Sequence, residues 1–314
     1  MRRLAHPPAF LTALAILAGC EIGETTFAEP EEMIVAEVFI YGDARNHTAF
    51  LHRAGSGPGG QGGPVKGASI EVTDPEGRTI RFVEAYPEYC IEFSGAVAIP
   101  GGTCYIPAEG GDDALVRPGT TYTLRIELPD GRILTGQTTV PGDFRILTPA
   151  PDPSGYPICT LSSDTPVELA WTRSAGAWVY IAEAELWGLA RALEPRGIEV
   201  DNPYRVLGFA VSENDTTIAF PGEFGIFERF NDREILLAIR DGLPNGVLVA
   251  GAIAAADRNY VNWIRGGRFN PSGLVRIPSI AGDGTGVFGS LVVRGFVLDG
   301  ARATNPPPPP CPAP

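Results

Sequence analysis

The strongest constraint on the fold is a run of alternating apolar side chains that ends in a turn signal. Tyr122, Leu124, Ile126 and Leu128 occupy every second position, and the sequence Pro-Asp-Gly follows at 129–131. A period of two places all four side chains on one face of a β-strand, because successive strand side chains point to opposite faces. Proline and glycine then favour a tight turn. The pattern predicts a β-hairpin with one buried face.

The same pattern recurs along the chain and sets the predicted fold class. Segments 34–41, 70–72 and 80–82 have strand character, and the last two flank the turn residues at 74–77. Short strands separated by regular turn signals are typical of antiparallel sandwiches. We therefore expect a mainly β protein made of two antiparallel β-sandwich-like domains of the immunoglobulin or fibronectin III kind. Further strands are expected at 167–171, 178–181, 206–211, 217–220, 234–240, 247–255 and 287–297.

One or two short helices are expected in the second half. Helical spacing over 186–193 ends at Pro195 and Gly197, which favour termination. Asp257 is expected to cap a helical turn that carries Tyr260, Val261 and Ile264 on one face.

Prolines and glycines indicate where the domains end. The chain has 39 glycines and 30 prolines, and a proline cluster follows position 142. We predict an N-terminal domain over 33–142 and a C-terminal domain over 143–304. A proline-rich tail at 305–314 favours polyproline II geometry, which gives a stiff spacer.

The N-terminus indicates export and lipidation. Two arginines at positions 2 and 3 precede a short apolar run and the lipobox Leu17-Ala18-Gly19-Cys20. The run is about half as long as a bilayer-spanning helix needs, so 1–19 is predicted to be a lipoprotein signal peptide. Cys20 is then the lipidated first residue, and the glutamate-rich segment 20–32 is a hydrated tether. The expected location is the cell envelope, on the outer membrane, held by the lipid anchor.

Four cysteines remain after Cys20 is assigned to lipid, and an even number suits disulfides in an oxidising compartment. Three pairings are open, besides the alternative of free buried thiols. We predict the local pair Cys90–Cys104 and the long-range pair Cys159–Cys311, which would fix the tail. Metal binding is not expected, because the cysteines show no CxxC spacing.

No catalytic residue is predicted from the sequence, and the chain is interpreted as a non-enzyme. His47 and His52 lie beside a glycine-rich loop, where we do not expect the defined geometry of a triad. The alternative is a carboxylate-dependent envelope hydrolase that uses Glu223, Glu228 and Asp232, the densest acidic group of the second domain.

A formal GxGxxG match at 284–289 does not predict a nucleotide cofactor. A dinucleotide fingerprint opens a helix, whereas a strand-like segment follows these glycines. Asp283 lacks the ligand series of an EF-hand, and a glycine turn that leads into a buried strand is the preferred interpretation. No cofactor is expected.

Aromatic side chains provide a candidate binding patch for a protein partner or a glycan, with core packing as the alternative. Its members are Phe224, Phe227, Phe230, Tyr260, Trp263 and Phe269. The net charge of −13 falls to −15 after residues 1–19 are removed, because they carry two arginines and no acid. Such acidity disfavours nucleic acid and anionic membrane surfaces as partners.

Several motifs follow one another in a recognisable order: the lipobox, the acidic tether, VKGASIEV at 65–72, PGTTYTL at 118–124, TVP at 139–141 and GTGVFG at 284–289. This order resembles a family of bacterial outer-membrane lipoproteins of unknown function, often found beside TonB-dependent receptors. The resemblance implies a β-rich exported accessory protein and no reaction. A binding or accessory module is therefore the predicted function, with the hydrolase or a structural envelope protein as alternatives.

Overall fold

A computed structural model of the chain describes most residues after the predicted tether. The described ranges are 33–54, 63–90, 101–108, 115–210, 214–224, 233–266, 277–301 and 305–312. The predicted signal peptide, Cys20 and the acidic tether lie outside these ranges and stay predictions. All described residues belong to one compact unit, Glu32–Pro314.

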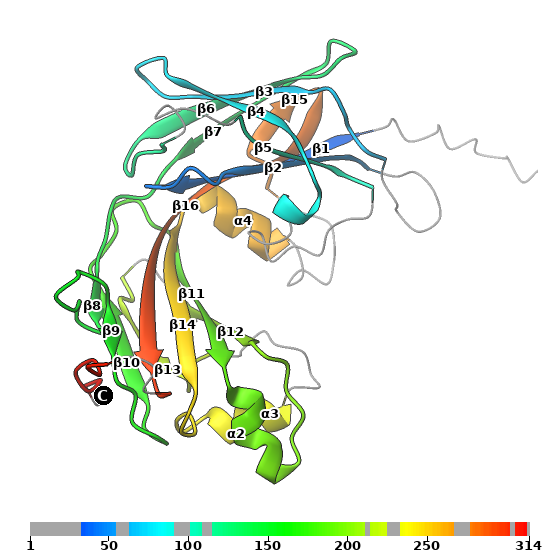
Figure 1. Cartoon of the computed structure of the whole chain (residues 1–314). Coiled ribbons are helices and arrows are strands. Elements are labelled where there is room, and N and C mark those ends of the chain that lie inside the picture. The colour runs from blue at the N-terminus through cyan, green and yellow to red at the C-terminus, as the bar shows by residue number, and fades with distance from the viewer. Residues whose placement is uncertain are drawn as a thin grey trace, which may run out of the picture. The chain divides into compact units, whose positions relative to one another are not determined.

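In the first region, nine strands of the described chain form a closed ring (Figure 1). Their order around the ring is β1-β2-β5-β4-β3-β6-β7-β15-β16, and β16 pairs with β1. The strands are β1 (Ile34–Gly42), β2 (Thr48–Arg53), β3 (Ser69–Thr73), β4 (Thr79–Ala85), β5 (Thr103–Pro107), β6 (Thr121–Glu127), β7 (Ile133–Thr139), β15 (Ile280–Gly282) and β16 (Gly284–Asp299).

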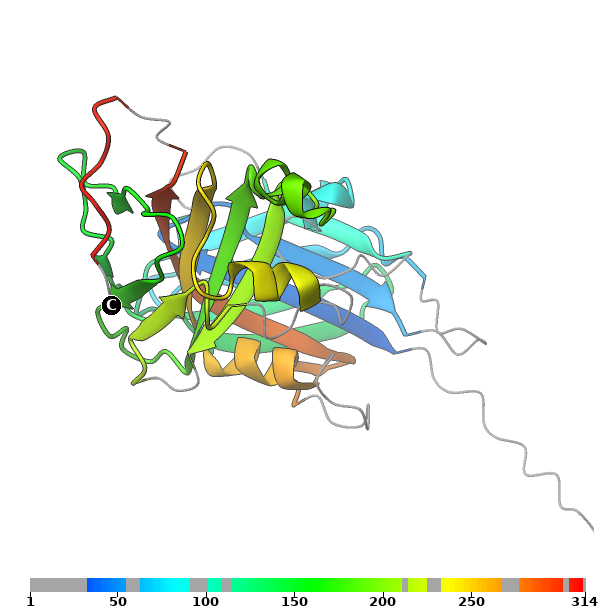
Figure 2. The ribbon, with the colours of Figure 1, turned by 90° about the horizontal axis from the view of Figure 1, so that it is seen from below.

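This ring changes the predicted architecture of the first region. The mainly β class is confirmed, but the first region is a barrel and not an open sandwich. The cause is the parallel pairing of β1 with β16, from Ile34 opposite Gly284 to Gly42 opposite Val292. Figure 2 shows the two strands running side by side. Because β16 comes from the other end of the chain, the two predicted domains share a strand.

In the second region, the end of β16 continues the sheet in the order β16-β14-β11-β12, and β9 pairs with the outer side of β16. A separate three-stranded sheet, β13-β10-β8, packs against it, and the rings of Trp171 and Tyr180 meet with centroids 5.3 Å apart. The strands are β8 (Ile146–Thr148), β9 (Ile158–Cys159), β10 (Val167–Trp171), β11 (Val179–Trp187), β12 (Tyr204–Ala210), β13 (Thr217–Phe220) and β14 (Leu248–Ala256).

The two hairpins predicted from turn residues are confirmed. β3 pairs antiparallel with β4, and β6 pairs antiparallel with β7. Gly77 and Gly131 in the connecting turns have φ angles of 84° and 88°, in the left-handed region that glycine adopts without steric cost. The alternating residues Tyr122, Leu124 and Ile126 are buried, as their period indicates.

The helices confirm one prediction and correct another. As expected, a short helix, α2 (Leu189–Leu193), is followed by a 3-10 turn at Glu194–Arg196. The predicted strand at 234–240 is wrong, because the segment forms α3 (Arg233–Ile239). Ile235 and Ile239 are its buried residues, and their spacing of four places both on one helical face. The remaining helix is α4 (Arg258–Gly266).

None of the helices among the described residues has both the length and the apolar character needed to cross a bilayer.

Both predicted disulfides are present: Cys90 is bonded to Cys104 and Cys159 to Cys311. The second bond fixes the proline-rich tail beside β9. Thr160 strengthens this attachment, since its N–H and hydroxyl donate to the carbonyls of Pro309 and Pro308 at 2.7 Å each. The tail is therefore held at several points.

The predicted strand at 287–297 is confirmed, but the glycine turn expected before it is wrong, because β16 already begins at Gly284 and the glycines at 284–289 belong to the strand. A Cβ on Gly286, which has a φ of +142°, would lie 1.9 Å from the carbonyl oxygen of Ala36. A Cβ on Gly284 would lie 2.7 Å from the carbonyl oxygen of Ile34. These glycines therefore permit the close approach of β16 and β1 that closes the ring.

Candidate functional site

The candidate site depends on the placement of α4, which Asp257 fixes. The buried Asp257 Oδ1 accepts hydrogen bonds from the backbone N–H groups of Tyr260 at 2.8 Å and Ser290 at 3.2 Å, and its Oδ2 accepts one from the Thr138 hydroxyl. Burial raises the pKa of this carboxyl above its ordinary value. The predicted helix cap at Asp257 is confirmed, and it connects α4 to β16 and β7.

The apolar face of α4 packs against β1 and β16 in a second cluster, separate from the main core. The ring of Phe39 lies edge-on to Tyr260 and Trp263, with centroid distances of 5.3 and 5.1 Å. The Trp263 indole N–H donates to Glu37 Oε1 at 3.0 Å. A Cβ on Gly289 would lie 3.2 Å from the Tyr260 Cβ, so this glycine lets the helix lie close to the strand.

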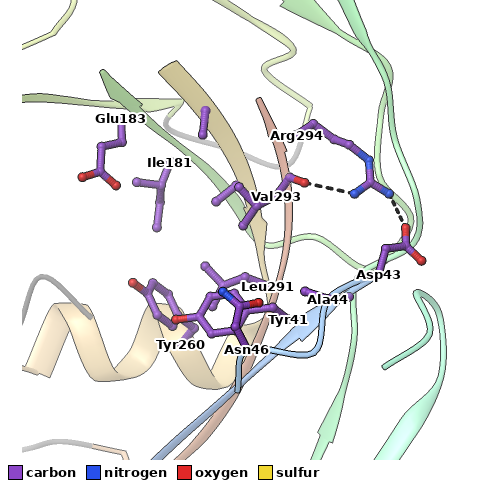
Figure 3. Close-up of a pocket in the computed structure, with 13 residues that line it drawn as sticks. Tyr41, Asp43, Ala44, Asn46, Ile181, Glu183, Tyr260, Leu291, Val293 and Arg294 are labelled. Atoms are coloured by element: carbon purple, nitrogen blue, oxygen red, sulfur yellow. Dashed lines mark hydrogen bonds and ion pairs between the residues drawn. The ribbon is translucent and has the colours of Figure 1, made fainter. Parts of the chain in front are cut away.

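A cavity of about 320 Å³ lies beside this cluster (Figure 3). The end of β1 and the loop after it, β11, β14, β16 and α4 all contribute to its lining. Its apolar side is formed by Ile181, Ala252, Ala254 and Leu291. The register places Ile181 opposite Ala254 and Glu183 opposite Ala252. The short alanine side chains leave the space that larger residues would fill.

Alternation in β11 explains why a carboxylate lines this cavity. Tyr180, Ala182 and Ala184 belong to the main core, so Ile181 and Glu183 point to the opposite face of the sheet. Burial raises the pKa of Glu183, nearby Glu185 raises it further, and Arg205 opposes the shift. Among the described residues, no side chain forms a hydrogen bond or an ion pair with the Glu183 carboxylate.

Two tyrosines complete the polar lining, and Figure 3 shows both below Glu183 and Ile181. Burial raises the pKa of Tyr41 well above its ordinary value, and the nearby Tyr260 and Glu183 raise it further. Burial and Glu183 likewise raise the pKa of Tyr260. Both hydroxyls therefore stay neutral at physiological pH. Asn46 adds an exposed amide at the same cavity.

The cations near the cavity already have acidic partners. Arg294 binds the carboxylates of Asp43 and Asp143 through Nη2, and it donates to the carbonyl oxygens of Phe144 at 3.2 Å and Val293 at 3.0 Å. On β12, which pairs with β11, Arg205 binds Glu185 at 2.7 Å. Neither guanidinium group forms a hydrogen bond with Glu183.

The structure separates the members of the predicted aromatic patch. Phe224 is 6% exposed and packs in the main core, where its ring meets Phe220 at a centroid distance of 4.9 Å. Tyr260 and Trp263 lie in the α4 cluster, and only Tyr260 lines the cavity. The other predicted members, Phe227, Phe230 and Phe269, lie outside the described residues. A continuous patch is therefore not formed by the described members.

Of the three carboxylates named for the alternative hydrolase, Glu223 lies within the described residues. Glu223 Oε2 accepts a hydrogen bond from the backbone N–H of Ala219, which uses this carboxylate in a local turn. Glu228 and Asp232 lie outside the described residues. Asp283 also has a local role, because its Oδ2 accepts a hydrogen bond from the Ile133 N–H at 2.8 Å.

The two histidines are both buried. His47 is fully buried, and its Nδ1 accepts a hydrogen bond from the Tyr41 N–H at 3.2 Å. His52 is buried within β2. Over the described ranges, no group of His, Cys, Asp and Glu side chains is arranged to hold a metal ion.

Sequence reasoning missed Tyr41 and Glu183. Each occupies a segment that is mostly apolar and indicates only a buried strand, and β1 is distant from β11 along the chain. A charged residue inside the apolar segment 179–187 was the available signal for Glu183.

Comparisons with known proteins give little further information. No family model matches the chain, and no curated protein matches it. Among solved structures, the FN1-FN3 domains of chicken CNTN1 align with a TM-score of 0.20 and 9% identity. That alignment covers 83% of this chain and 66% of the other chain. A similarity at this level has no bearing on function.

Proposed function

We propose that this chain is an exported, lipid-anchored accessory protein of the cell envelope that binds a ligand in the cavity between Tyr41, Glu183 and Tyr260. It acts by binding, alongside an outer-membrane receptor, and not by catalysis. The observation that carries this proposal is the cavity itself, which β1, β11, β14, β16 and α4, from distant parts of the chain, build around a carboxylate and two phenol groups.

The cavity has the composition of a small-molecule site. Such sites are concave, mostly apolar and equipped with a few polar groups that orient the ligand. Here Ile181 and Leu291 supply apolar surface, while Glu183 and Asn46 supply the polar groups. The Asp257 cap and the aromatic contacts of α4 hold the Tyr260 side of the cavity in place before a ligand arrives.

The envelope location is supported by the lipobox and by the cysteine pairs. Disulfides persist in oxidising compartments, and this chain has two that bridge separate parts of the structure. The acidic segment after Cys20 would keep the folded part away from the membrane surface. For the second region we propose a sandwich of the fibronectin III kind, supported by the contact between Trp171 and Tyr180 across its two sheets.

Photo-cross-linking in living cells tests the binding function. A photoreactive residue replaces Asn46, which lines the cavity and is exposed, and in a control it replaces the exposed Glu168 on β10. We expect a specific adduct at position 46, detected by the mass of the purified chain, and none at position 168. Identical adduct patterns at both positions, or no adduct at position 46, would contradict the proposal.

Lipid anchorage is tested separately by metabolic labelling with a fatty-acid analogue. The wild-type chain should incorporate the label and sediment with the membrane, and Cys20→Ser should abolish both. Labelling that persists in Cys20→Ser would remove the anchor from the proposal.

A further inference from the structure

We propose that the cavity binds a small organic cation with an ammonium group, for which Glu183 is the counter-ion and the rings of Tyr41 and Tyr260 form aromatic walls. This inference rests on the proposed binding function and specifies its ligand class.

The distribution of charge in the lining favours a cation over an anion. Glu183 has no hydrogen-bonded or ion-paired partner among the described residues, although it lines the cavity. Arg294 also lines the cavity, but its guanidinium already binds the carboxylates of Asp43 and Asp143. Arg205 lies close enough to lower the pKa of Glu183, but its ion pair is with Glu185. An anionic ligand would therefore meet the Glu183 carboxylate and guanidinium groups that already bind other carboxylates, whereas an ammonium group would form an ion pair with Glu183 directly.

The aromatic lining favours an organic cation over a hydrated metal ion. Tyrosine rings attract ammonium groups through their electron-rich faces, with a contribution of about 0.5–2 kcal/mol that grows as water is excluded. The raised pKa values of Tyr41 and Tyr260 keep both phenols neutral, so they present rings and hydroxyl groups and no competing ionised oxygen. On the apolar side of the cavity, Ala252 and Ala254 suit contact with methylene or methyl groups that surround the charge of the ligand.

The dimensions agree with a small ligand. The volume of about 320 Å³ lies at the lower end of the range of small-molecule sites.

Calorimetric titration of the purified full chain tests the inference with a matched pair of probes. Choline carries the ammonium charge, and 3,3-dimethylbutan-1-ol is its neutral counterpart of nearly identical shape. We expect choline to bind and the neutral alcohol to bind at least about tenfold more weakly, because the charge interaction with Glu183 is lost. Addition of salt should weaken choline binding, as it does for a partly exposed charge pair.

Variants of the lining residues test whether choline binds in this cavity. Glu183→Gln should weaken choline binding by about tenfold or more, whereas Glu168→Gln, the same change at an exposed position of β10, should leave affinity within about twofold. Tyr260→Leu should also weaken choline binding by removing one aromatic wall. Thermal unfolding of each variant shows whether it is folded. Unchanged affinity in folded Glu183→Gln would overturn the inference.

Further outcomes separate this inference from the proposed function. In one outcome, choline does not bind, while a neutral saccharide binds wild type and loses affinity in Ala252→Phe. This outcome would overturn the cation inference and retain a binding function for the cavity. No binding of any probe, combined with no adduct at position 46, would overturn both.

Discussion

Asp257 Oδ1 accepts a hydrogen bond from the backbone N–H of Tyr260 over 2.8 Å. This contact fixes the start of α4, the helix that carries the cavity residue Tyr260. The same oxygen also accepts from Ser290 on β16. A buried carboxylate that is not itself part of the cavity lining therefore helps to position Tyr260, together with the ring contact to Phe39.

Replacement of this carboxylate should destabilise the protein. Asp257→Ala should lower the free energy of unfolding by about 3 kcal/mol, because it removes a helix cap and leaves the buried Thr138 hydroxyl and Ser290 N–H without this acceptor. Asp257→Asn keeps one acceptor oxygen and should lose less. Urea denaturation measures both, and equal losses below about 0.5 kcal/mol would contradict the assigned role.

The pH dependence of stability should report the same group. Burial raises the folded-state pKa of Asp257 above its unfolded value of about 3.9, so the folded state binds this proton more tightly. That contribution to stability is complete below the unfolded pKa and is lost as pH rises through the folded pKa. As pH rises from the unfolded to the folded pKa, the free energy of unfolding of wild type should therefore fall relative to that of Asp257→Asn. A constant difference between the two proteins would contradict the shift.

Removal of the tail disulfide should have a larger effect than removal of the local one. The Cys159–Cys311 bond closes a loop with a separation of 152 residues, and the Cys90–Cys104 bond closes one of 14. The chain-entropy model gives about 5 and about 3 kcal/mol respectively. Paired Cys→Ser variants, compared by denaturant unfolding, should show this order. Peptide mapping without reduction checks the pairing, and any other linkage would contradict the structure.

Closure of the ring should depend on Gly286. Gly286→Ala places a Cβ 1.9 Å from a backbone oxygen of β1, and we expect a loss of about 4 kcal/mol or failure to fold. Gly289→Ala meets Tyr260 at 3.2 Å and should cost about 1 kcal/mol. Gly63→Ala, with its nearest atom at 3.5 Å, is the control and should change stability by less than about 0.5 kcal/mol. A Gly286→Ala protein as stable as the control would show that the strands do not approach this closely.

Choline binding should weaken as pH falls. The carboxylate form of Glu183 is required, and its raised pKa means that protonation begins at a higher pH than for an ordinary glutamate. Glu185, Arg205, Tyr41 and Tyr260 are the other titratable groups that influence this site. Affinity should be constant well above the pKa of Glu183 and decline below it. Glu183→Gln should show little of this decline, and an unchanged pH profile in that variant would assign the effect elsewhere.

Local features of the fold could be predicted from the sequence, whereas long-range pairing could not. The turn glycines at 77 and 131 and the period of two identified both hairpins, since these signals act between neighbouring residues. The pairing of Ile34 with Gly284 depends on two segments at opposite ends of the chain, and neither carries a local mark of its partner. A closed ring was therefore missed.

The wrong strand prediction at α3 and the failure to predict the cavity have related causes. The apolar segment 235–239 has no clear period, and a short apolar run fits a strand or a buried helix equally well. The cavity required Tyr41, Glu183 and Tyr260 to converge, which only the tertiary structure reveals. The cysteine pairs were predictable, because four thiols allow few arrangements and one pair is local.

The most direct test of the binding site is an NMR titration of the full chain with labelled tyrosine rings. The chain has nine tyrosines, and Tyr41→Phe and Tyr260→Phe assign the two that line the cavity. Addition of choline should shift the ring signals of Tyr41 and Tyr260, and the same shifts should require at least about tenfold more 3,3-dimethylbutan-1-ol, or about tenfold more choline in Glu183→Gln. Choline-induced shifts confined to other tyrosines, or no shift at saturating choline, would contradict the assignment of this cavity as a cation site.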